Sequence, residues 1–499
     1  MLALATNHLP LLLQWRDVYS EPDLYKAALR VYTKPLFQWR KALATSTDGK
    51  TLYDFAAHGL ARLDTIHRSL QRGAFQFRPA VALRYNFNGK HRTLFIPPWE
   101  ERVVDLLLYR ILNRKLHSFL SPDSYAYRDR KYSLDTCQTR IAALTRSAAG
   151  PLYLVKRDVS NFFASIDHQL LLHRLAKLVD PGDYLFTLLQ QRVNFSYQQD
   201  GLPHTAKIGV PFGTSIACLF ANIYLTDLDH HIAGIPNVHF FRYADDMLLL
   251  SPNRGSAIQA GELLDVSLNE LRLKSKPSHQ SDLLLSKEIA FTKISSEGIS
   301  AANIFCDEIS TDTQFSRANS FRHLGLLFRA GGAVALSRDK TRKIQNMFRF
   351  AFRRKRRRWN AENSPHARAR LLAAIAAEAV DKSIRNVAVL DYYLKHVNDE
   401  QQLHLLDRWL AEEVLSAVFG GHKKGHFRRI SFQQLRDMGL PSLLHRRRML
   451  CSGKLESPFF VWQREKASRA FQGTVARLCR SADRATFSSF PEAAAAKRP

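Results

Sequence analysis

The feature that most constrains this chain is a pair of adjacent acids, Asp245 and Asp246, between short runs of apolar and aromatic residues at 240–243 and 247–250. Two such runs around a polar pair predict a strand, a tight turn and a second strand, with the acids at the tip. Like charges side by side in an apolar hairpin destabilise it unless a cation neutralises them. Exposed turns also contain Asp-Asp pairs, but solvated turns are rarely flanked by Phe-Phe and Met-Leu-Leu-Leu. The pattern therefore favours a divalent cation at the tip.

A second predicted strand ends on a further carboxylate. Residues 152–158 form a largely apolar run that ends on Asp158. Two hard cations held roughly 3.5–4 Å apart for an in-line attack on a phosphate need bridging carboxylates. We expect Asp158 and Asp245 to lie side by side in one sheet as catalytic residues and metal ligands, with Asp246 in support.

The motif Tyr243-Ala244-Asp245-Asp246 resembles the palm hairpin of reverse transcriptases, and the segment around Asp158 resembles their first palm motif. The similarity is greatest to the group II intron-like bacterial branch. Further similar elements follow in the family's order: an N-terminal extension (46–79), a fingers hairpin (88–97), a helix start (101–104), a Ser-Tyr-aromatic-Arg element (124–128), the second palm motif (209–215 and 221–225) and a primer-grip hairpin (321–328). One short match could arise by chance, but several matches in order are much less expected by chance.

The resemblance implies an α+β right-hand polymerase, with fingers, a palm built on an antiparallel sheet, and a helical thumb. It divides the chain into an N-terminal helical extension (1–80), fingers and palm (81–330), thumb (331–400) and a basic helical C-terminal extension (401–499). The implied activity is RNA-directed DNA synthesis by two-metal nucleotidyl transfer with Mg²⁺, or with Mn²⁺ in its place. The backbone carbonyl of Val159 is then expected as an additional metal ligand.

Several residues acquire expected roles in nucleotide binding from the same resemblance. Lys90 and Arg92, in the fingers hairpin, would contact the triphosphate and offset charge on the departing pyrophosphate. A solvated basic hairpin is the alternative for both residues. Phe163 would lie under the sugar and exclude a 2′-hydroxyl, thereby selecting deoxynucleotides, although either Phe162 or Phe163 could instead belong to the core.

The second palm motif departs from the family's usual pattern at one position. Pro211 and Gly213 would bring the backbone close to the nascent base pair. Between them stands Phe212, where relatives usually have Gln. A polar contact near the incoming nucleotide is therefore lost or replaced by stacking, with fidelity, template dependence or base preference as the properties affected.

The charge of the chain favours a polyanionic partner. Its 73 basic and 45 acidic residues give a net charge of +28. Such an excess destabilises a compact chain by self-repulsion unless a polyanion neutralises it, and nucleic acid is the economical partner. An anionic membrane surface is the alternative. No apolar stretch approaches a transmembrane length, the N-terminus lacks the basic region of a signal peptide, and the five cysteines are scattered, so a cytoplasmic location is expected.

Part of this charge lies in one predicted helix, from an N-cap at Ser337 to Trp359. Its run of six basic residues covers every side of a helix. As a thumb helix it would follow a nucleic-acid backbone; the alternative is a solvated charge run. The arginines expected to bind nucleic acid are Arg353, Arg354, Arg356 and Arg357.

The biological role stays more open than the chemistry. The chain has no Cys/His endonuclease module at its C-terminus, and it is longer than a minimal enzyme needs, which makes it similar to bacterial "unknown group" enzymes, many of them associated with phage defence. The expected partners are an RNA template or a cognate non-coding RNA, dNTPs and the DNA product, with an oligomer left open. Alternatives are a template-independent or protein-primed DNA polymerase, and a maturase-like RNA-binding scaffold.

Overall fold

The computed structural model describes residues 12–35, 38–87, 90–276, 282–286, 315–381, 384–457 and 461. Its first part is helical, with α1 (Trp15–Val18), α2 (Glu21–Thr33), α3 (Gln38–Leu43), α4 (Leu52–Ala57) and α5 (Gly59–Gln71). Side-chain caps begin two of them, because Ser20 accepts from the Asp23 amide and Thr51 forms a reciprocal capping box with Asp54. Helix α2 packs against α6 (Trp99–Lys115), which lies beside the sheets described next.

A four-stranded sheet contains the hairpin predicted near residue 90. Strands β1 (Ala80–Phe87) and β2 (Lys90–Ile96) pair antiparallel along their whole length. The sheet continues through β4 (Ser196–Gln199) to β5 (Leu202–Thr205), in the order β2-β1-β4-β5. The predicted hairpin is thus confirmed.

A five-stranded sheet carries the predicted acids. Its order is β6 (His239–Tyr243), β7 (Asp246–Ser251), β3 (Leu152–Asp158), β8 (Asp282–Leu285) and β9 (Ser316–Ala318). The first four strands are antiparallel neighbours, whereas β8 and β9 run parallel. Strands β3 and β7 pair in a register that sets Asp158 opposite Asp246. The expectation that Asp158 and the Asp-Asp hairpin share one sheet is therefore confirmed.

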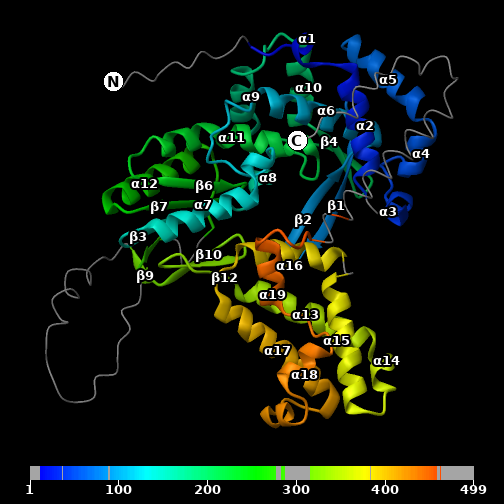
Figure 1. Cartoon of the computed structure of the whole chain (residues 1–499). Helices are drawn as coiled ribbons and strands as arrows, with labels where there is room; N and C mark the ends of the chain where they lie inside the picture. The colour runs from blue at the N-terminus through cyan, green and yellow to red at the C-terminus, as the bar shows by residue number, and fades with distance from the viewer. Residues whose placement is uncertain are drawn as a thin grey trace.

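Helices cover both faces of this sheet (Figure 1). The long helices α11 (Ser215–Ala233) and α12 (Arg254–Glu270) pack on one side, and α7 (Leu134–Ser147) packs on the other. Shorter helices precede α11: η1 (Arg130–Tyr132), α8 (Phe162–Ser165), α9 (His168–Ala176) and α10 (Tyr184–Val193). Alternate residues of the central strands enter two different cores, as the two-residue period of a strand requires. Val155, Met247 and Leu249 join α11 and α12 in one core, and Leu154, Leu248 and Leu250 join the C-terminal helices in the other.

A small antiparallel sheet connects this region to the C-terminal helices. It consists of β10 (Ser320–His323), β11 (Leu326–Arg329) and β12 (Val334–Leu336). On the outer edge of β12, the Val334 amide donates to the Asn398 side chain, and the Leu336 amide donates to the Gln402 side chain, each at 2.6 Å. The Gln402 amide donates in return to the Leu336 carbonyl at 3.0 Å, and the Asn398 backbone amide donates to the Val334 carbonyl at 3.0 Å.

The C-terminal helices group together beneath the sheets in Figure 1. They are α13 (Arg338–Arg354), α14 (Arg356–Asn360), α15 (Pro365–Asp381), α16 (Ile384–His396), α17 (Glu400–Phe419), η2 (Lys424–Arg428), α18 (Phe432–Asp437) and α19 (Leu443–Cys451). No helix in the described ranges is both long and apolar enough to cross a membrane. The mixture of antiparallel strands and packed helices confirms the predicted α+β class.

One prediction for this region is wrong: the helix expected from Ser337 to Trp359 is not continuous. It ends at Arg354, and Lys355 has φ −105° and ψ 18° before α14 begins. Two contacts favour the break, because Lys355 pairs with Glu378 on α15 and the indole of Trp359 donates to the Phe352 carbonyl at 2.9 Å as it turns into the core. Ser337 does occupy the N-cap position, but its side chain makes no capping hydrogen bond.

Candidate active site

The turn between β6 and β7 presents Asp245 beyond the end of the paired strands. Strand pairing ends at Tyr243 and Asp246, so the turn consists of Ala244 and Asp245. Ala244 has a left-handed backbone, with φ 58°, which an L-residue adopts only at some cost. A hydrogen bond of 3.1 Å from Nη1 of Arg242 to the Ala244 carbonyl holds this conformation. The predicted hairpin with acids at its tip is confirmed.

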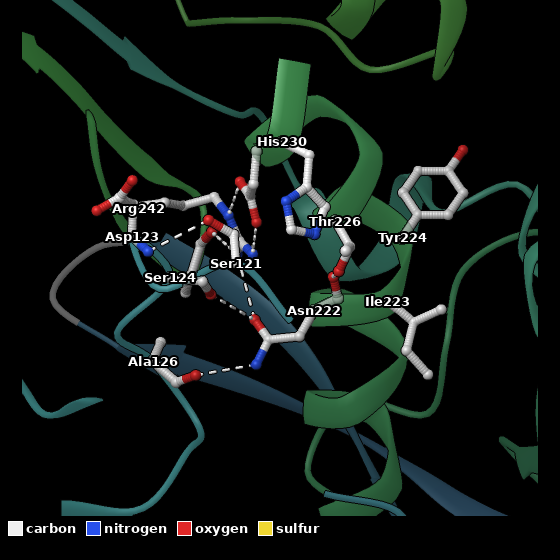
Figure 2. A network of polar contacts seen from close by, with 12 residues as sticks. Ser121, Asp123, Ser124, Ala126, Asn222, Ile223, Tyr224, Thr226, His230 and Arg242 are labelled. Carbon is white, nitrogen blue, oxygen red and sulfur yellow. Dashed lines mark hydrogen bonds and ion pairs between the residues drawn. The ribbon is translucent and has the colours of Figure 1, made fainter. Parts of the chain in front are cut away.

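Arg242, next to that turn, belongs to a buried polar network, which Figure 2 shows from close by. Arg242 makes two hydrogen bonds to the Asp229 carboxylate, of 2.6 and 2.5 Å, and both side chains are fully buried. Its Nη1 also donates to Oδ1 of Asn222 at 3.2 Å, while the Asn222 amide donates to the Ala126 carbonyl at 2.9 Å. Burial raises the pKa of Asp229, and the Arg242 guanidinium opposes that rise. The network thereby links the acidic hairpin, helix α11 and residues 121–126.

Sequence reasoning missed this network as a part of the site. The available signal was an arginine inside an apolar strand, at Arg242, together with Asn222 and Asp229 in a helix that is apolar over much of its length. Buried charges are usually paired, so the pattern called for a partner. Which residue supplied it depends on the packing of α11 against β6.

Asp158 and Asp245 lie close enough for their charges to interact. The Val159 amide donates to the Asp245 carbonyl at 3.3 Å, which ties the end of β3 to the turn. Burial raises the pKa of Asp245, and the neighbouring Asp158 carboxylate raises it further. Lys276 approaches the pair from the segment after α12, with its Nζ 2.5 Å from Oδ1 of Asp158.

Asp246 has a different environment from its neighbour. Its Oδ1 lies 3.4 Å from Nδ1 of His323, on β10, and 3.5 Å from Nζ of Lys156, without good hydrogen-bond geometry in either contact. Burial alone would raise the pKa of Asp246, but the nearby His323 and Lys156 outweigh it and the pKa is lowered. The two adjacent acids therefore differ: Asp246 lies near Lys156 and the His323 ring, whereas Asp245 lies near the like charge of Asp158.

The donor chemistry at Asp158 and Asp245 fits a hard divalent cation. Carboxylate oxygens are the preferred ligands of Mg²⁺, and a cation between the two groups would remove their mutual repulsion. Within the described ranges, however, no three His, Cys, Asp or Glu side chains are gathered as a ready ligand set. The pair therefore supplies only part of a coordination shell, and substrate phosphates and water are the usual remaining ligands of Mg²⁺.

Phe163 stands beside the second palm-like loop. The Val210 amide donates to the Phe163 carbonyl, and the Gly209 amide to the Ile166 carbonyl, both at 2.8 Å. Gly209 has φ +81°, and a Cβ there would lie 2.9 Å from the Cα of Ala164, so only glycine allows this approach. Phe162 is buried in the core, whereas Phe163 is partly exposed. Of the two rings, Phe162 is therefore the one that belongs to the core.

The ring of Phe212 packs on Phe163, with centroids 4.9 Å apart. The Arg92 guanidinium lies 6.0 Å from the Phe212 ring centre, and the Phe95 amide donates to the Phe212 carbonyl at 2.9 Å. Hairpin β1–β2 is thus attached to the loop that carries Pro211, Phe212 and Gly213. The side chain of Lys90 lies outside the described part of the structure; its backbone pairs with Phe87.

Gly213 completes this attachment, since its φ is +106° and a Cβ there would lie 3.3 Å from the Phe95 carbonyl oxygen. Pro211 is buried and Gly213 is exposed. The structure therefore brings Arg92, Phe163 and residues 211–213 together in one region.

The four arginines expected to bind nucleic acid lie elsewhere, on α13 and α14. Figure 1 shows α14 at the end of the C-terminal helices that lies away from β6 and β7. The residues that line a hollow of the surface there are Arg353, Arg354, Lys355, Arg356, Arg357, Arg358 and Asn360. All of the arginines among them are exposed. They are not part of the acidic site.

Comparisons with known proteins agree with this geometry. Residues 86–314 match the family model described as reverse transcriptase (RNA-dependent DNA polymerase). Residues 86–314, slightly less than half of the chain, are therefore similar to a reverse transcriptase domain, which agrees with the predicted right-hand polymerase class.

The curated relatives are intron-encoded proteins. The group II intron-encoded protein LtrA of Lactococcus lactis subsp. cremoris is 24% identical over 216 residues, which is 42% of this chain and 34% of LtrA. The putative COX1/OXI3 intron 1 protein of Saccharomyces cerevisiae is 22% identical over 195 residues, 39% of this chain and 23% of that protein. The matched part thus spans between 23% and 34% of these relatives' own length.

Solved structures with a similar arrangement include telomerases. That of Candida tropicalis, in complex with a TWJ fragment of telomeric RNA, has a TM-score of 0.41 and 12% identity, covering 84% of this chain and 68% of that chain. That of Candida albicans, also with a TWJ fragment, has a TM-score of 0.40 and 11% identity over 77% of this chain and 71% of the other.

Proposed function

We propose that this protein is an RNA-directed DNA polymerase that joins nucleotides at Asp158 and Asp245. The observation that carries the proposal is the meeting of these two carboxylates, from the end of β3 and the β6–β7 turn, inside the matched reverse transcriptase segment. Asp158, Asp245 and the Val159 carbonyl would hold Mg²⁺, or Mn²⁺ in its place, with Asp246 as a supporting metal ligand. Bound there, the cations would stabilise charge on the attacking and leaving oxygens.

The neighbouring side chains would position the nucleotide. Lys90 and Arg92 would offset the triphosphate charge, and Phe163 would lie under the sugar. Residues 211–213 would approach the nascent base pair. Because the Phe212 carbonyl is bonded to β2, a nucleotide that draws Arg92 inward would also act on this loop.

The regions around this site suggest further assignments. Residues 1–80 would be the N-terminal extension, 81–330 the fingers and palm, 331–400 the thumb and 401–499 the C-terminal extension. Arg353, Arg354, Arg356 and Arg357 would neutralise phosphates of a bound RNA or hybrid. Following the resemblance to "unknown group" enzymes, we propose a cytoplasmic role in phage defence with a cognate structured RNA.

A template-independent polymerase is the second candidate, and one observation favours it. The ring of Phe212 packs on Phe163, in a loop where a polar side chain is usual. An apolar ring at this place removes one polar contact to the incoming nucleotide and leaves stacking in its place.

Extension of a DNA primer on an RNA template tests the proposal directly. With dNTPs and Mg²⁺ we expect products whose sequence copies the template, and no products when EDTA removes the metal. Gels and sequencing of the products give the readout. Sequence-independent tails would favour the template-independent candidate, and a lack of incorporation with every template and metal would leave an RNA-binding scaffold.

Substituting Phe163 by Ala should admit ribonucleotides, because the missing ring leaves space for a 2′-hydroxyl while the carboxylates are untouched. We expect the ratio of rNTP to dNTP incorporation to rise by about tenfold or more. This is the effect of removing an unfavourable contact between the ring and the 2′-hydroxyl of about one to two kcal/mol. The matched control is Phe162→Leu, which should lower stability through the core and leave the ratio unchanged. An unaltered ratio in an active Phe163→Ala variant would place the sugar selection elsewhere.

A further inference from the structure

The outward face of α13 carries an aromatic ring that the fold does not use. Phe350 is 63% exposed, although it lies inside a regular helix. The opposite side of the same helix buries Ile344, Phe348 and Phe352, which supply its packing against the C-terminal core. Burying a phenylalanine stabilises a protein, so leaving one in water gives up that gain.

Basic side chains surround this ring. Helical spacing places Asn346 one turn before Phe350, Lys343 two turns before it, and Arg353 and Arg354 one turn after it, all on the same exposed side. At 1.5 Å of rise per residue, the span from Lys343 to Arg354 is about 16 Å.

In the described part of the chain, only some of the charges on and beside this face have a carboxylate partner. Arg349 and Lys355, which flank the face, pair with Glu413 and Glu378. Arg353 and Arg354, by contrast, have no carboxylate partner in the ranges that the structure describes. An exposed ring among unpaired cations complements a ligand that offers both a flat apolar surface and a row of negative charges.

We propose that this face binds an unpaired stretch of nucleic acid, with one base stacked on Phe350 and the adjoining phosphates held by Lys343, Arg353 and Arg354. Stacking on exposed aromatic rings requires bases that are free of a duplex, in which they stack on one another. The inference deepens the proposed function and rests on its assignment of the arginine run to nucleic acid. It adds that these arginines bind a single strand of nucleic acid, and not only the backbone of a duplex.

Fluorescence anisotropy with the full chain, without dNTPs, tests this site. Three labelled ligands of equal length serve as probes: an unstructured RNA strand, an RNA duplex, and an abasic ribose-phosphate strand. Phe350→Ala should weaken binding of the RNA strand by about tenfold, the scale of one lost stacking contact. Affinity for the duplex and the abasic strand, and the salt dependence of all three, should not change, because the charges are intact.

The control variants separate stacking from exposure. Phe350→Trp should restore strand binding, because it restores an aromatic face. Leu405→Ala removes a side chain of similar exposure, 66%, on α17, and should bind all three probes like the wild-type chain. Equal losses of Phe350→Ala on all three probes, or no loss on the RNA strand, would overturn the proposal. The proposal would also be overturned if Phe350→Ala weakened binding to anionic vesicles but not to the RNA strand, because the face would then be a membrane contact.

A fourth variant distinguishes two outcomes: failure of the proposed stacking on Phe350, and failure of the proposed nucleic-acid binding by the arginines. Gln in place of Arg353, Arg354, Arg356 and Arg357 should weaken binding of every probe and flatten the plot of log K against log salt by about two to four units. Wild-type binding by this variant would refute the nucleic-acid role of the run. Weakened binding here, with an unaffected Phe350→Ala variant, would refute the stacking site alone.

Discussion

Replacing Asp245 by Asn is expected to reduce dNTP incorporation by about a thousandfold or more while leaving the fold intact, since several kcal/mol of metal-derived transition-state stabilisation would be lost. The amide has the shape of the carboxylate but lacks its negative charge, so it binds a divalent cation much more weakly. Asp158→Ala should have a similar effect. Rates of primer extension under saturating template and dNTP give the measurement.

Stability should move in the opposite direction to activity. Burial and the Asp158 charge raise the pKa of Asp245, so its ionised form is unfavourable in metal-free protein. Asp245→Asn removes that repulsion, and its Tm in EDTA should equal or exceed the wild-type value. Addition of Mg²⁺ should raise the wild-type Tm more than that of the variant.

The matched control for this prediction is Asp265→Asn, on α12. It makes the same chemical change at a carboxylate that pairs with Arg157 and stands outside the acidic turn. Activity should be retained in this control. If a folded chain with both Asp158→Ala and Asp245→Asn extended primers at the wild-type rate, the acidic turn would not be the active site.

Asp229→Ala is expected to cost about 3–5 kcal/mol of stability, which is the usual penalty for leaving one charge of a buried pair without its partner. Arg242 would lose two hydrogen bonds in a place where neither group contacts water. Urea unfolding monitored by fluorescence would show the loss. Activity should also fall, because Arg242 holds the Ala244 carbonyl beside Asp245.

Asp227→Ala, two residues earlier on the same helix, is the control. Asp227 pairs with Arg174 at the surface and its side chain is 45% exposed, so its loss should cost no more than about 1 kcal/mol. Combining Asp229→Ala with Arg242→Met should recover part of the stability, because no unpaired charge remains, without recovering activity. An Asp229→Ala variant as stable as Asp227→Ala would mean that the network does not support the turn.

The acidic hairpin and the strand before Asp158 were predictable because their signals are local. Apolar runs with a polar pair between them define two strands and a turn without reference to the rest of the chain. That these two strands belong to one sheet was a prediction across a longer distance in sequence. The register that sets Asp158 opposite Asp246 confirmed it.

The remaining features depend on contacts that are distant in sequence. Lys276 contacts Asp158, and His323 contacts Asp246. Both come from segments far along the chain, so no local pattern indicated these contacts. The break at Lys355 was missed for a related reason. Arginine and lysine favour helix, and a local reading extends the helix through them. Burial of Trp359 and the pair with Glu378 override that preference.

The outer edge of β12 has a consequence for how this protein behaves at high concentration. Exposed strand edges are templates on which a strand of another molecule can pair, and they promote aggregation. Here the outward amides and carbonyls of Val334 and Leu336 are already occupied by Asn398 and Gln402. The Asn398 and Gln402 side chains, together with the Asn398 backbone amide, thus imitate a neighbouring strand, and Val334 and Leu336 offer no open backbone groups at this edge for a second molecule to extend.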